Sequence, residues 1–374
     1  MRANGTEEPA ARASDPRSEP RACAPVASDV PVEDDVEDDV EDDVEPPSPW
    51  IAEPALPPHT EPVLDRLLDA SIVFSFDRTG YRRHAKGFAP GDLDVDLTGQ
   101  TCLVTGASSG LGIEIARGLA ERGASVHMLC RDVAKGEAVR ETIDGARAWQ
   151  LVVAPIDLSD FGSIRRYVQT HAPSTIDVLV HNAGVLPDAR TTTADGLELT
   201  VATNLVGPFL LTHLLWERLR ADARVIHVSS GGMYSQKLDV PTLFDPPEPF
   251  DGVAAYARTK RAQVVLTELL HDRSTRRLSS MHPGWADTPG VQTSLPRFRR
   301  VTKAILRTPA EGADTALWLA ASPAASSPEG RFYFDRAPRT THLSRRTHER
   351  PEDRTQLWRT LCERIGADPD TAFR

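Results

Sequence analysis

The chain has 374 residues, 40% of them hydrophobic, which is enough for one large α/β domain with a full core and extensions. Its formal net charge is −11, yet residues 33–45 hold ten acidic residues and no basic one, so the remainder lies near −1. Such a remainder carries no global basic field of the kind that nucleic acid attracts, and nucleic acid is excluded as an expected partner.

The four cysteines, Cys23, Cys102, Cys130 and Cys362, are far apart and form no CxxC pair or Cys/His cluster. This spacing predicts reduced cysteines and no metal site. The N-terminus lacks the apolar stretch of a secretory signal, and no stretch approaches the ~20 apolar residues needed to span a bilayer. We therefore expect a cytoplasmic protein.

Residues 1–60 combine many Pro, Ala, Arg and Ser residues with a Val-Glu-Asp-Asp repeat that begins at Val32, Val36 and Val40. The repeat repels itself by charge, and its valines are too few to build a core. This segment is predicted to be a disordered acidic and Pro-rich tail without catalytic residues. A solubilising extension is favoured, and an acidic interaction tail is the alternative.

Residues 61–98 form a pre-core amphipathic segment, in which apolar residues recur at helical spacing before a break at Gly80. Packing of this stripe against the protein's own domain is favoured, because amphipathic helices mostly bury their apolar face internally. A cap over a substrate pocket and contact with a membrane surface stay open as alternatives. The apolar positions are Leu64, Leu67, Leu68, Ile72, Phe74 and Phe76.

Short buried strands alternate with amphipathic helical stretches through residues 99–343, and residues 344–374 form a C-terminal extension with one candidate short helix. The alternation predicts a single doubly wound parallel sheet of about seven strands with helices on both faces, and a ligand site at the carboxyl ends of the strands. The expected strands are 101–104, 125–130, 150–154, 176–180, 223–228, 277–281 and 330–334. The expected helices include 112–122, 163–171, 197–219 and 256–272.

The first expected strand ends in a Gly-rich turn, Thr-Gly-Ala-Ser-Ser-Gly-Leu-Gly, that precedes a helix. Gly106 permits the tight turn, Gly110 lets the backbone approach a pyrophosphate, and Gly112 allows close helix packing. The free N–H groups and the positive dipole at the helix N-terminus favour a phosphate. The predicted cofactor contacts in this turn are Gly106, Ser108, Ser109, Gly110, Leu111 and Gly112.

Tyr256 and Lys260 lie one helical turn apart and therefore share a face of their expected helix. A Tyr that exchanges a proton near neutrality needs its pKa lowered by about three units from ~10, which corresponds to about 4 kcal/mol. A unit positive charge at ~4 Å supplies a similar energy at an effective dielectric constant of ~20. We therefore expect Lys260 to lower the pKa of Tyr256, so that Tyr256 serves as a general acid and base.

Five separated segments together resemble the short-chain dehydrogenase/reductase superfamily: residues 105–112, His181-Asn-Ala-Gly184, Asn204, Ser230 and Tyr256-Ala-Arg-Thr-Lys260. Their order and spacing carry the resemblance, since each motif alone is a weak signal. The resemblance implies a Rossmann-type fold that binds NAD(P)(H). It also implies an oxidoreductase that transfers hydride between nicotinamide and a carbonyl or alcohol substrate.

The same resemblance implies a role for each catalytic residue. Ser230 would polarise and position the substrate oxygen, and Lys260 would also hold the nicotinamide ribose. Asn204 would steady a water that relays protons from Lys260, although an Asn that only bridges backbone groups is the alternative. Further implied cofactor contacts are Asp157, Leu158, Asn182, Ala183, Gly184, Tyr256, Lys260, Pro283, Gly284 and Thr288.

A narrower resemblance, to one branch of the superfamily, runs from about Leu67 to about Leu343. It implies no particular substrate, and it leaves the acidic tail and the last thirty residues outside. The matching phrases include Val126-His-Met-Leu-Cys-Arg-Asp132, Val228-Ser-Ser-Gly-Gly-Met233 and Ser279-Ser-Met-His-Pro-Gly-Trp285.

The end of the second expected strand bears on the choice of cofactor. An acidic side chain there would bind a ribose 2′-hydroxyl, whereas an Arg can pair with a 2′-phosphate. Arg131 stands at this position, and similarity to superfamily members with Cys-Arg-Asp implies that NADP(H) is favoured over NAD(H). Asp132 next to it argues the other way, and an exposed structural Arg131 is the alternative.

The loop between Ser230 and Tyr256 is longer than in many relatives and resembles that of retinol-dehydrogenase-like members. We expect it to frame the substrate pocket. Its apolar side chains either line the pocket or pack against the loop's own base. These side chains are Phe244, Phe250, Met233 and Tyr234.

Trp285 is expected at the rim of the same pocket, and a basic strip follows it in the sequence. A solvated helix face is favoured for this strip, with an anionic substrate or a membrane as alternatives. The strip consists of Arg297, Arg299, Arg300 and Lys303.

The favoured function is an NADP(H)-dependent carbonyl reductase or alcohol dehydrogenase that acts on an apolar small molecule. A ketoreductase of secondary metabolism and a lipid or retinoid reductase both stay open within this class. The alternative is a regulator that binds NADP(H) without turnover, against which the presence of Ser230, Tyr256 and Lys260 argues. A homo-oligomer is compatible with the sequence.

Overall fold

The structure, a computed structural model, describes residue 68 and residues 72–143, 150–325 and 330–373. The chain divides into two units, residues 1–52 and residues 53–374, and all described residues belong to the second. The predicted tail at residues 1–60 therefore lies outside the described residues, as do Leu64 and Leu67 of the pre-core stripe.

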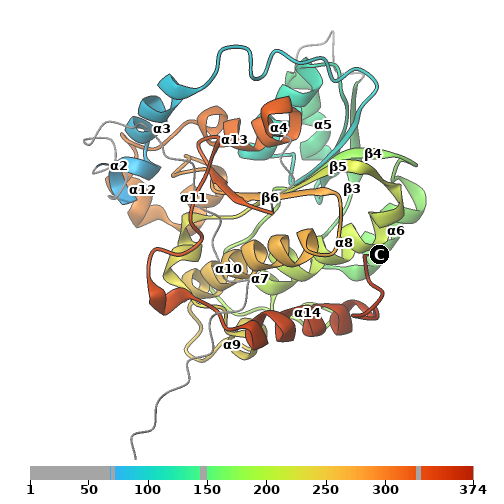
Figure 1. Cartoon of the computed structure of the whole chain (residues 1–374), viewed down its shortest axis with the longest axis vertical. Helices are drawn as coiled ribbons and strands as arrows, with labels where there is room; N and C mark the ends of the chain where they lie inside the picture. Colours follow the sequence, from blue (N-terminus) through green and yellow to red (C-terminus); the bar gives the residue numbers. More distant parts are fainter. Residues whose placement is uncertain (1–67, 69–71, 144–149, 326–329, 374) are drawn as a thin grey trace, which may run out of the picture. The chain divides into compact units, whose positions relative to one another are not determined.

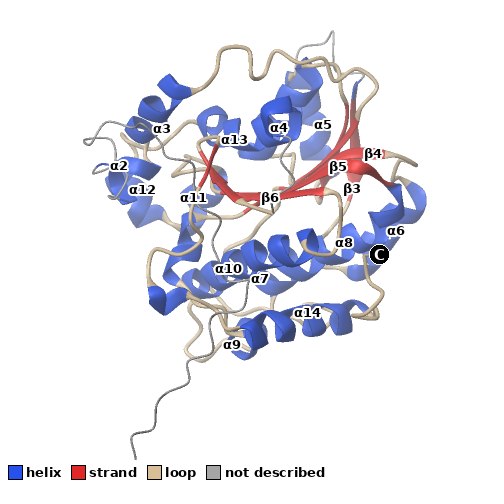
Figure 2. Ribbon diagram, viewed as in Figure 1, coloured by secondary structure: helices blue, strands red, loops and turns tan. Residues whose placement is uncertain are grey.

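One sheet with the strand order β3-β2-β1-β4-β5-β6-β7-β8 lies at the centre of the described chain (Figure 2). Strands β1 to β7 are parallel, and β8 pairs antiparallel with β7. The doubly wound sheet is confirmed, with an eighth strand whose two residues are too few to give a hydrophobic run. The strands are β1 (Thr101–Thr105), β2 (Ser125–Cys130), β3 (Leu151–Pro155), β4 (Ile176–His181), β5 (Leu219–Val228), β6 (Arg277–Met281), β7 (Phe332–Phe334) and β8 (Ala337–Pro338).

Helices cover both faces of this sheet, and α14 lies outside one of the two layers (Figure 1). Because side chains alternate along a strand, Cys102 and Val104 of β1 pack with α4, α5 and α13, while Leu103 packs with α6, α8, α10 and α14. The bounds are α4 (Leu111–Glu121), α5 (Val133–Thr142), α13 (Pro309–Ala321), α6 (Phe161–Thr170), α8 (Gly207–Leu215), α10 (Gly252–His271) and α14 (Pro351–Ile365).

Short polar side chains set where several of these helices begin. Asp132, Asp160 and Asp251 each accept a hydrogen bond from a backbone N–H in the first turn of α5, α6 and α10. Thr308 and Glu311 form a reciprocal capping box at the start of α13. These caps fix the N-termini of four helices, α5, α6, α10 and α13.

The helical run after β4 is interrupted, whereas the sequence predicts one helix over residues 197–219. α7 (Leu199–Val201) passes into a π-helical turn at Ala202–Val206, and α8 ends in a 3-10 turn at Trp216–Arg218. The expectation of one helix is wrong, because a π turn leaves the apolar period of the sequence almost unchanged. Leu219 belongs to β5, where it pairs with Ile176 of β4.

The stretch Leu199–Arg218 is long and apolar enough, by length and composition alone, to cross a membrane. This differs from the expectation that no stretch approaches that length. Within the protein, 83% of its most apolar window is buried, which is the behaviour of a core helix.

Two further regions lie outside the strand–helix alternation. Before β1, α2 (Ile72–Phe76) and α3 (Arg78–His84) replace the single stripe expected from the sequence. In the C-terminal extension, α14 has fifteen residues and buries Leu357, Trp358 and Leu361 in the core. The remaining short helices are α9 (Val240–Phe244), α11 (Pro289–Ser294) and α12 (Pro296–Thr302).

The chain order of the strands reverses between β1 and β4, which are neighbours in the sheet. In open α/β sheets, ligands bind in the crevice at the carboxyl ends of the strands beside such a switch point. The fold therefore places a ligand site next to Thr105 and His181, the last residues of β1 and β4.

Candidate active site

The Gly-rich turn between β1 and α4 brings backbone close to backbone. Gly106 and Gly110 have φ of +67° and +55°, a region that favours glycine. A Cβ on Gly112 would lie 2.4 Å from the carbonyl oxygen of Gly106, and one on Gly110 would lie 3.2 Å from Cβ of Thr288. The turn is therefore tightly packed and faces the segment after β6, while its contacts with a cofactor stay a prediction.

The start of α4 offers hydrogen-bond donors. Gly110 occupies its N-cap position and has no side chain to satisfy the first N–H groups, and Leu111 opens the helix. Ser108 and Ser109 lie partly exposed in the same turn. Free N–H groups at the N-terminus of an eleven-residue helix fit the phosphates of a dinucleotide.

The ends of β1 and β4 are tied together across the switch point. Thr105 Oγ1 accepts hydrogen bonds from the backbone N–H groups of Asn182 and Ala183, both at 3.0 Å. The Asn182 amide donates to the Thr105 carbonyl at 2.9 Å. This arrangement holds the predicted Asn182-Ala183-Gly184 support beside the Gly-rich turn.

The ends of β2 and β3 carry the predicted contacts for the adenosine part of a dinucleotide. Arg131 is exposed directly after β2, and Asp132 uses its carboxylate to cap α5 through the backbone N–H of Lys135 at 3.0 Å. After β3, Asp157 accepts hydrogen bonds from the backbone N–H and hydroxyl of Ser159, and Leu158 is buried. Both pairs lie at the carboxyl edge of the sheet.

Ser230, Tyr256 and Lys260 converge at the carboxyl end of β5. Ser230 follows this strand, and its Oγ accepts a hydrogen bond from the N–H of Gly232 at 3.2 Å. Tyr256 and Lys260 lie one turn apart on α10, with the Lys260 ammonium 5.4 Å from the centre of the Tyr256 ring. The structure thus brings together three residues that the sequence separates.

Burial controls the proton affinities of this group. It lowers the pKa of Lys260 to about 7, and the Lys260 ammonium donates a hydrogen bond to the carbonyl of Val228 at 2.8 Å. Burial also raises the pKa of Tyr256, against a smaller lowering by the hydrogen bond with Ser230. The expected lowering of the Tyr256 pKa by Lys260 is therefore wrong for the protein alone. Lys260 is only partly charged near neutrality, and its ammonium lies over the ring.

Asn204 lies in the π-helical turn and is fully buried. Its side chain accepts a hydrogen bond from the N–H of Val185 at 2.8 Å and donates to the carbonyl of Val185 and the hydroxyl of Thr259. The main-chain carbonyl of Asn204 accepts a hydrogen bond from the side-chain amide of Gln263 at 2.6 Å. The structure therefore shows the bridging role for Asn204, and the proton relay stays a prediction.

The segment after β6 closes the other side of the site. Gly284 has φ of +71°, and a Cβ there would lie 2.3 Å from Nε of the buried Arg307. Thr288 caps α11 through the N–H of Val291. Pro283, Gly284 and Thr288 therefore lie at the same carboxyl edge as the Gly-rich turn, with Gly110 against Thr288.

Several side chains of the long loop after Ser230 pack against the body of the protein. Met233 is fully buried and packs with Val264 and Phe332, and Phe244 packs against the main core. The Tyr234 hydroxyl donates to the carbonyl of Thr340 at 2.8 Å. These side chains therefore pack against other elements of the protein, and the lining of a substrate pocket by the loop stays a prediction.

Trp285 is half-buried, and its ring lies 5.1 Å from that of Phe298 in α12. In the basic strip, Arg299 pairs with Asp287 at 2.7 Å, while Arg297, Arg300 and Lys303 are exposed. Three of the four basic side chains are thus exposed, and the choice between a solvated face, an anionic substrate and a membrane stays a prediction.

Two residues beside Ser230 are missing from the sequence-based set of site residues. Phe76 of α2 and His282, directly after β6, both contact the loop that begins at Ser230. Phe76 belongs to the predicted amphipathic stripe, but its contact with the loop after Ser230 has no local signal, because these partners lie far away in the sequence. His282 stands immediately before the Pro-Gly pair, within the phrase Ser279–Trp285 that carries the narrower resemblance, and these positions are its signal.

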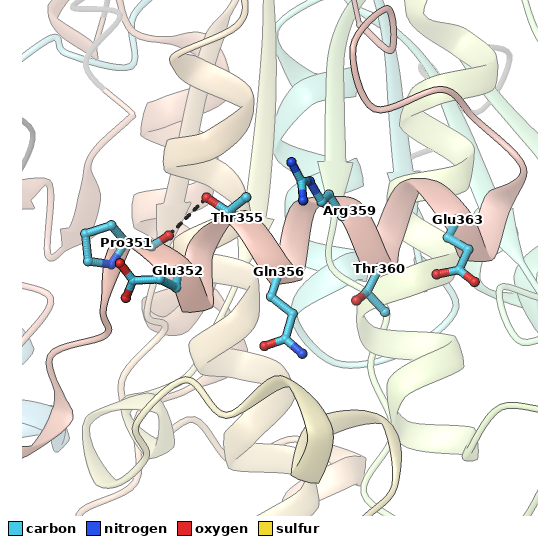
Figure 3. A pocket seen from close by; sticks show the side chains of 7 residues that line it. All are labelled: Pro351, Glu352, Thr355, Gln356, Arg359, Thr360 and Glu363. Atoms are coloured by element: carbon cyan, nitrogen blue, oxygen red, sulfur yellow. Dashed lines mark hydrogen bonds between the residues drawn. The ribbon is translucent and has the colours of Figure 1, made fainter.

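A hollow lies on the exposed face of α14 (Figure 3). None of the predicted site residues lines it. Among the described residues, no group of three or more His, Cys, Asp or Glu side chains could hold a metal ion. The residues that line the hollow are Pro351, Glu352, Thr355, Gln356, Arg359, Thr360 and Glu363.

A Gly-rich turn at the switch point of a doubly wound sheet, with Ser, Tyr and Lys at the neighbouring strand end, defines an NAD(P)-dependent oxidoreductase. The sequence model of the short chain dehydrogenase family matches residues 100–297, and the chain belongs to this family.

Named relatives agree with this class. Dehydrogenase/reductase SDR family member 12 of Homo sapiens is 44% identical over 274 residues, which cover 72% of this chain and 86% of the relative. This relative belongs to the branch of the superfamily that the longer matching phrases indicate, so the narrower resemblance is confirmed. Retinol dehydrogenase 12 of Homo sapiens is 35% identical over 283 residues, which cover 73% of this chain and 88% of that relative.

Among solved structures, an uncharacterized protein from Mycobacterium Paratuberculosis matches with a TM-score of 0.60 and 29% identity, covering 73% of this chain and 96% of its own. A 3-ketoacyl-(acyl-carrier-protein) reductase from Brucella melitensis, complexed with NADH, matches with a TM-score of 0.50 and 25% identity. It covers 63% of this chain and 96% of its own.

Proposed function

We propose that this chain is an NADP(H)-dependent oxidoreductase that interconverts an apolar carbonyl compound and its alcohol, with Tyr256 as the general acid and base. The observation that carries the proposal is the convergence of Ser230, Tyr256 and Lys260 at the end of β5, beside the cradle formed by the Gly-rich turn. A bound nicotinamide supplies or accepts the hydride.

The residues of the site divide the remaining work. Ser230 Oγ positions the substrate oxygen, and the Tyr256 hydroxyl gives or takes the proton at that oxygen. Because the pKa of Tyr256 is raised and that of Lys260 is about 7, proton transfer near neutrality needs added positive charge close to Tyr256. An oxidised nicotinamide ring carries such a charge.

Two features support the finer parts of the proposal. Arg131 is exposed at the end of β2 while the Asp132 carboxylate caps α5, so an anionic 2′-phosphate would meet Arg131 rather than a free carboxylate. Relatives named retinol dehydrogenase, 35% identical in one case, support an apolar substrate. Arg131 thus favours NADP(H), and the relatives favour a lipid-like carbonyl.

A screen of the purified full chain tests this function. NADPH oxidation is followed with a panel of aliphatic aldehydes, ketosteroids and retinoids, and NADP⁺ reduction with the matching alcohols. Turnover of at least one apolar substrate that is lost in Tyr256→Phe is the expected result. Tight binding of NADPH without turnover of any panel member would overturn the proposal and favour a regulator that binds the cofactor.

A further inference from the structure

The loop that presents Ser230 is held from behind by a histidine. The backbone N–H of Gly231, the residue after Ser230, donates to Nδ1 of His282 at 2.9 Å. His282 directly follows β6 and is 3% exposed. Because β5 and β6 are neighbours, their ends meet here, and the N–H of Ser229 also donates to the carbonyl of Met281 at 2.7 Å.

The direction of this hydrogen bond fixes the form of the imidazole. Since Nδ1 accepts, the ring proton is on Nε2, and Nε2 has no hydrogen-bond partner among the described residues. Burial, assisted by the charge of Arg307, lowers the pKa of His282 to about 3. The ring therefore stays neutral and keeps its acceptor across the pH range in which an enzyme of this kind works.

Aromatic neighbours hold the ring of His282 in place. Its centre lies 4.3 Å from that of Phe76 with an edge-to-face geometry, and 5.1 Å from that of Phe334 with nearly parallel planes. Phe76 is itself fixed, because its carbonyl accepts a hydrogen bond from the N–H of Trp285 at 2.8 Å. Phe76 lies outside the stretch that matches the family, residues 100–297.

The same two rings leave no space at Gly231. A Cβ on this residue would lie 2.5 Å from Cε2 of Phe76 and 3.0 Å from Nε2 of His282. Phe76 therefore packs against the backbone after Ser230, and His282 accepts a hydrogen bond from it. The N–H of Gly232 also donates to Ser230 Oγ. A shift of either ring would move Ser230 relative to Tyr256.

We propose that His282, wedged by Phe76, is a positioning residue that sets the location of Ser230 Oγ for catalysis through the hydrogen bond to Gly231. The inference rests on the proposed function, because it assigns a role to Ser230 in turnover. It makes α2, before the family-matched region, part of the support of the active site.

Two substitutions at His282 separate positioning from packing. His282→Phe keeps an aromatic ring between Phe76 and Phe334 but removes the acceptor for Gly231. His282→Asn removes the ring but offers an amide oxygen near the place of Nδ1. We expect kcat to fall about tenfold to a hundredfold in His282→Phe and to recover to within about threefold in His282→Asn, with NADPH affinity unchanged in both.

The controls distinguish this inference from the proposed function. His213→Phe makes the same exchange on α8, where the ring packs against Phe373 at 5.2 Å, and it should leave kcat unchanged. Tyr256→Phe marks the level of lost catalysis. If wild type turns over, Tyr256→Phe does not, and His282→Phe matches wild type, the positioning role is refuted while the proposed function stands. If wild type itself shows no turnover with any substrate, the proposed function fails.

A second pair of variants covers the case in which His282→Phe does not fold. Gly231→Ala should lower kcat, because its Cβ meets Cε2 of Phe76, and adding Phe76→Leu removes that atom. Recovery of kcat by about fivefold or more in the double variant, beyond the sum of the single effects, supports the inference. Strictly additive effects of the two changes would overturn it.

Discussion

The ammonium of Lys260 lies 5.4 Å from the centre of the Tyr256 ring, one helical turn along α10. At this position burial, rather than mutual charge, sets the proton affinity of both groups. It lowers the pKa of Lys260 to about 7 and raises the pKa of Tyr256. In the protein alone, Tyr256 therefore holds its proton more tightly than a free tyrosine, and Lys260 holds its proton less tightly than a free lysine.

Replacing Tyr256 with Phe should lower kcat by at least about a hundredfold, the usual scale for a lost general acid, while NADPH affinity stays within a few-fold. The ring remains and only the hydroxyl is removed, so packing should be preserved. Single-turnover hydride transfer followed by NADPH absorbance measures the effect. A rate near that of wild type would remove Tyr256 from the chemistry.

Lys260→Met should stabilise the protein near pH 7 when no cofactor is added. The folded pKa of about 7 is below the ordinary 10.5, so burying the charged lysine opposes folding at neutral pH. A pKa difference of about 3.5 corresponds to about 4 to 5 kcal/mol of folding free energy. Lys260→Met also loses the hydrogen bond to Val228, so we expect its free energy of unfolding to exceed that of wild type by about 1 to 3 kcal/mol.

The stability difference between wild type and Lys260→Met should depend on pH. Between pH 7 and 10.5 the unfolded chain holds a proton that folded Lys260 has released, so wild-type stability rises with pH across this window. The gap between wild type and Lys260→Met should therefore narrow toward pH 10 in urea unfolding experiments. Lys237→Met, at an exposed lysine, is the control and should follow wild type. A gap that does not depend on pH contradicts the lowered pKa.

Arg131→Ala should remove most of a preference for NADPH over NADH. A charge-assisted contact is worth about 1.5 to 3 kcal/mol, so NADPH affinity should fall roughly tenfold to a hundredfold while NADH affinity is unchanged. Calorimetric titration of both cofactors measures this. Arg359→Ala, on the exposed face of α14, is the control. Equal affinities of the wild type for the two cofactors would count against NADP(H).

Asp335→Asn should cost about 3 to 5 kcal/mol of stability near neutral pH, because it leaves Arg307 buried without its charge partner. Arg307 and Asp335 form a paired contact at 2.5 and 2.9 Å, and His84 bonds the same carboxylate at 2.5 Å. Asp245→Asn, in the exposed pair with Arg190, is the matched control and should cost at most about 1 kcal/mol.

The loss in Asp335→Asn should also depend on pH. Burial alone would raise the pKa of Asp335, but the hydrogen bond with His84 and the charge of Arg307 hold it below its ordinary value. The stabilisation is therefore present above pH ~4 and is lost as the pH falls through the lower folded pKa. Denaturant unfolding at several pH values should show the two proteins converging in acid. A constant difference down to pH ~2 would contradict this.

Deleting residues 1–81 should give an insoluble protein or a clear loss of thermal stability. The deletion removes Phe76 and the carbonyls of Ser75 and Asp77, which accept hydrogen bonds from the buried Arg307 guanidinium at 3.0 and 3.1 Å. Deleting only residues 1–50 is the control, and its composition predicts little change in melting temperature or turnover. Equal melting temperatures for both deletions would mean that α2 and α3 do not support the core.

The sequence predicts the seven parallel strands and the residues that meet at their carboxyl ends. These predictions succeed because a strand of a buried parallel sheet is a local run of apolar residues, and a Gly-rich turn is a local backbone requirement. Gly106, Ser230, Tyr256 and Lys260 come together once the order of strands and helices is known.

Local patterns fail where a feature leaves the apolar period unchanged or joins distant segments. The π-helical turn around Asn204 does not alter the hydrophobic spacing of its helix, so one continuous helix is expected there. The burial of α14 against α10 also lacks a local signal, because it depends on surfaces far away in the chain.

The sequence by itself therefore determined the fold class and indicated a candidate catalytic set, since both follow from hydrophobic period and motif order. Only the tertiary structure decided the proton affinities of Tyr256 and Lys260 and the support of Ser230 by His282 and Phe76. Burial depends on everything that packs around a group, and these partners come from segments that no local pattern connects.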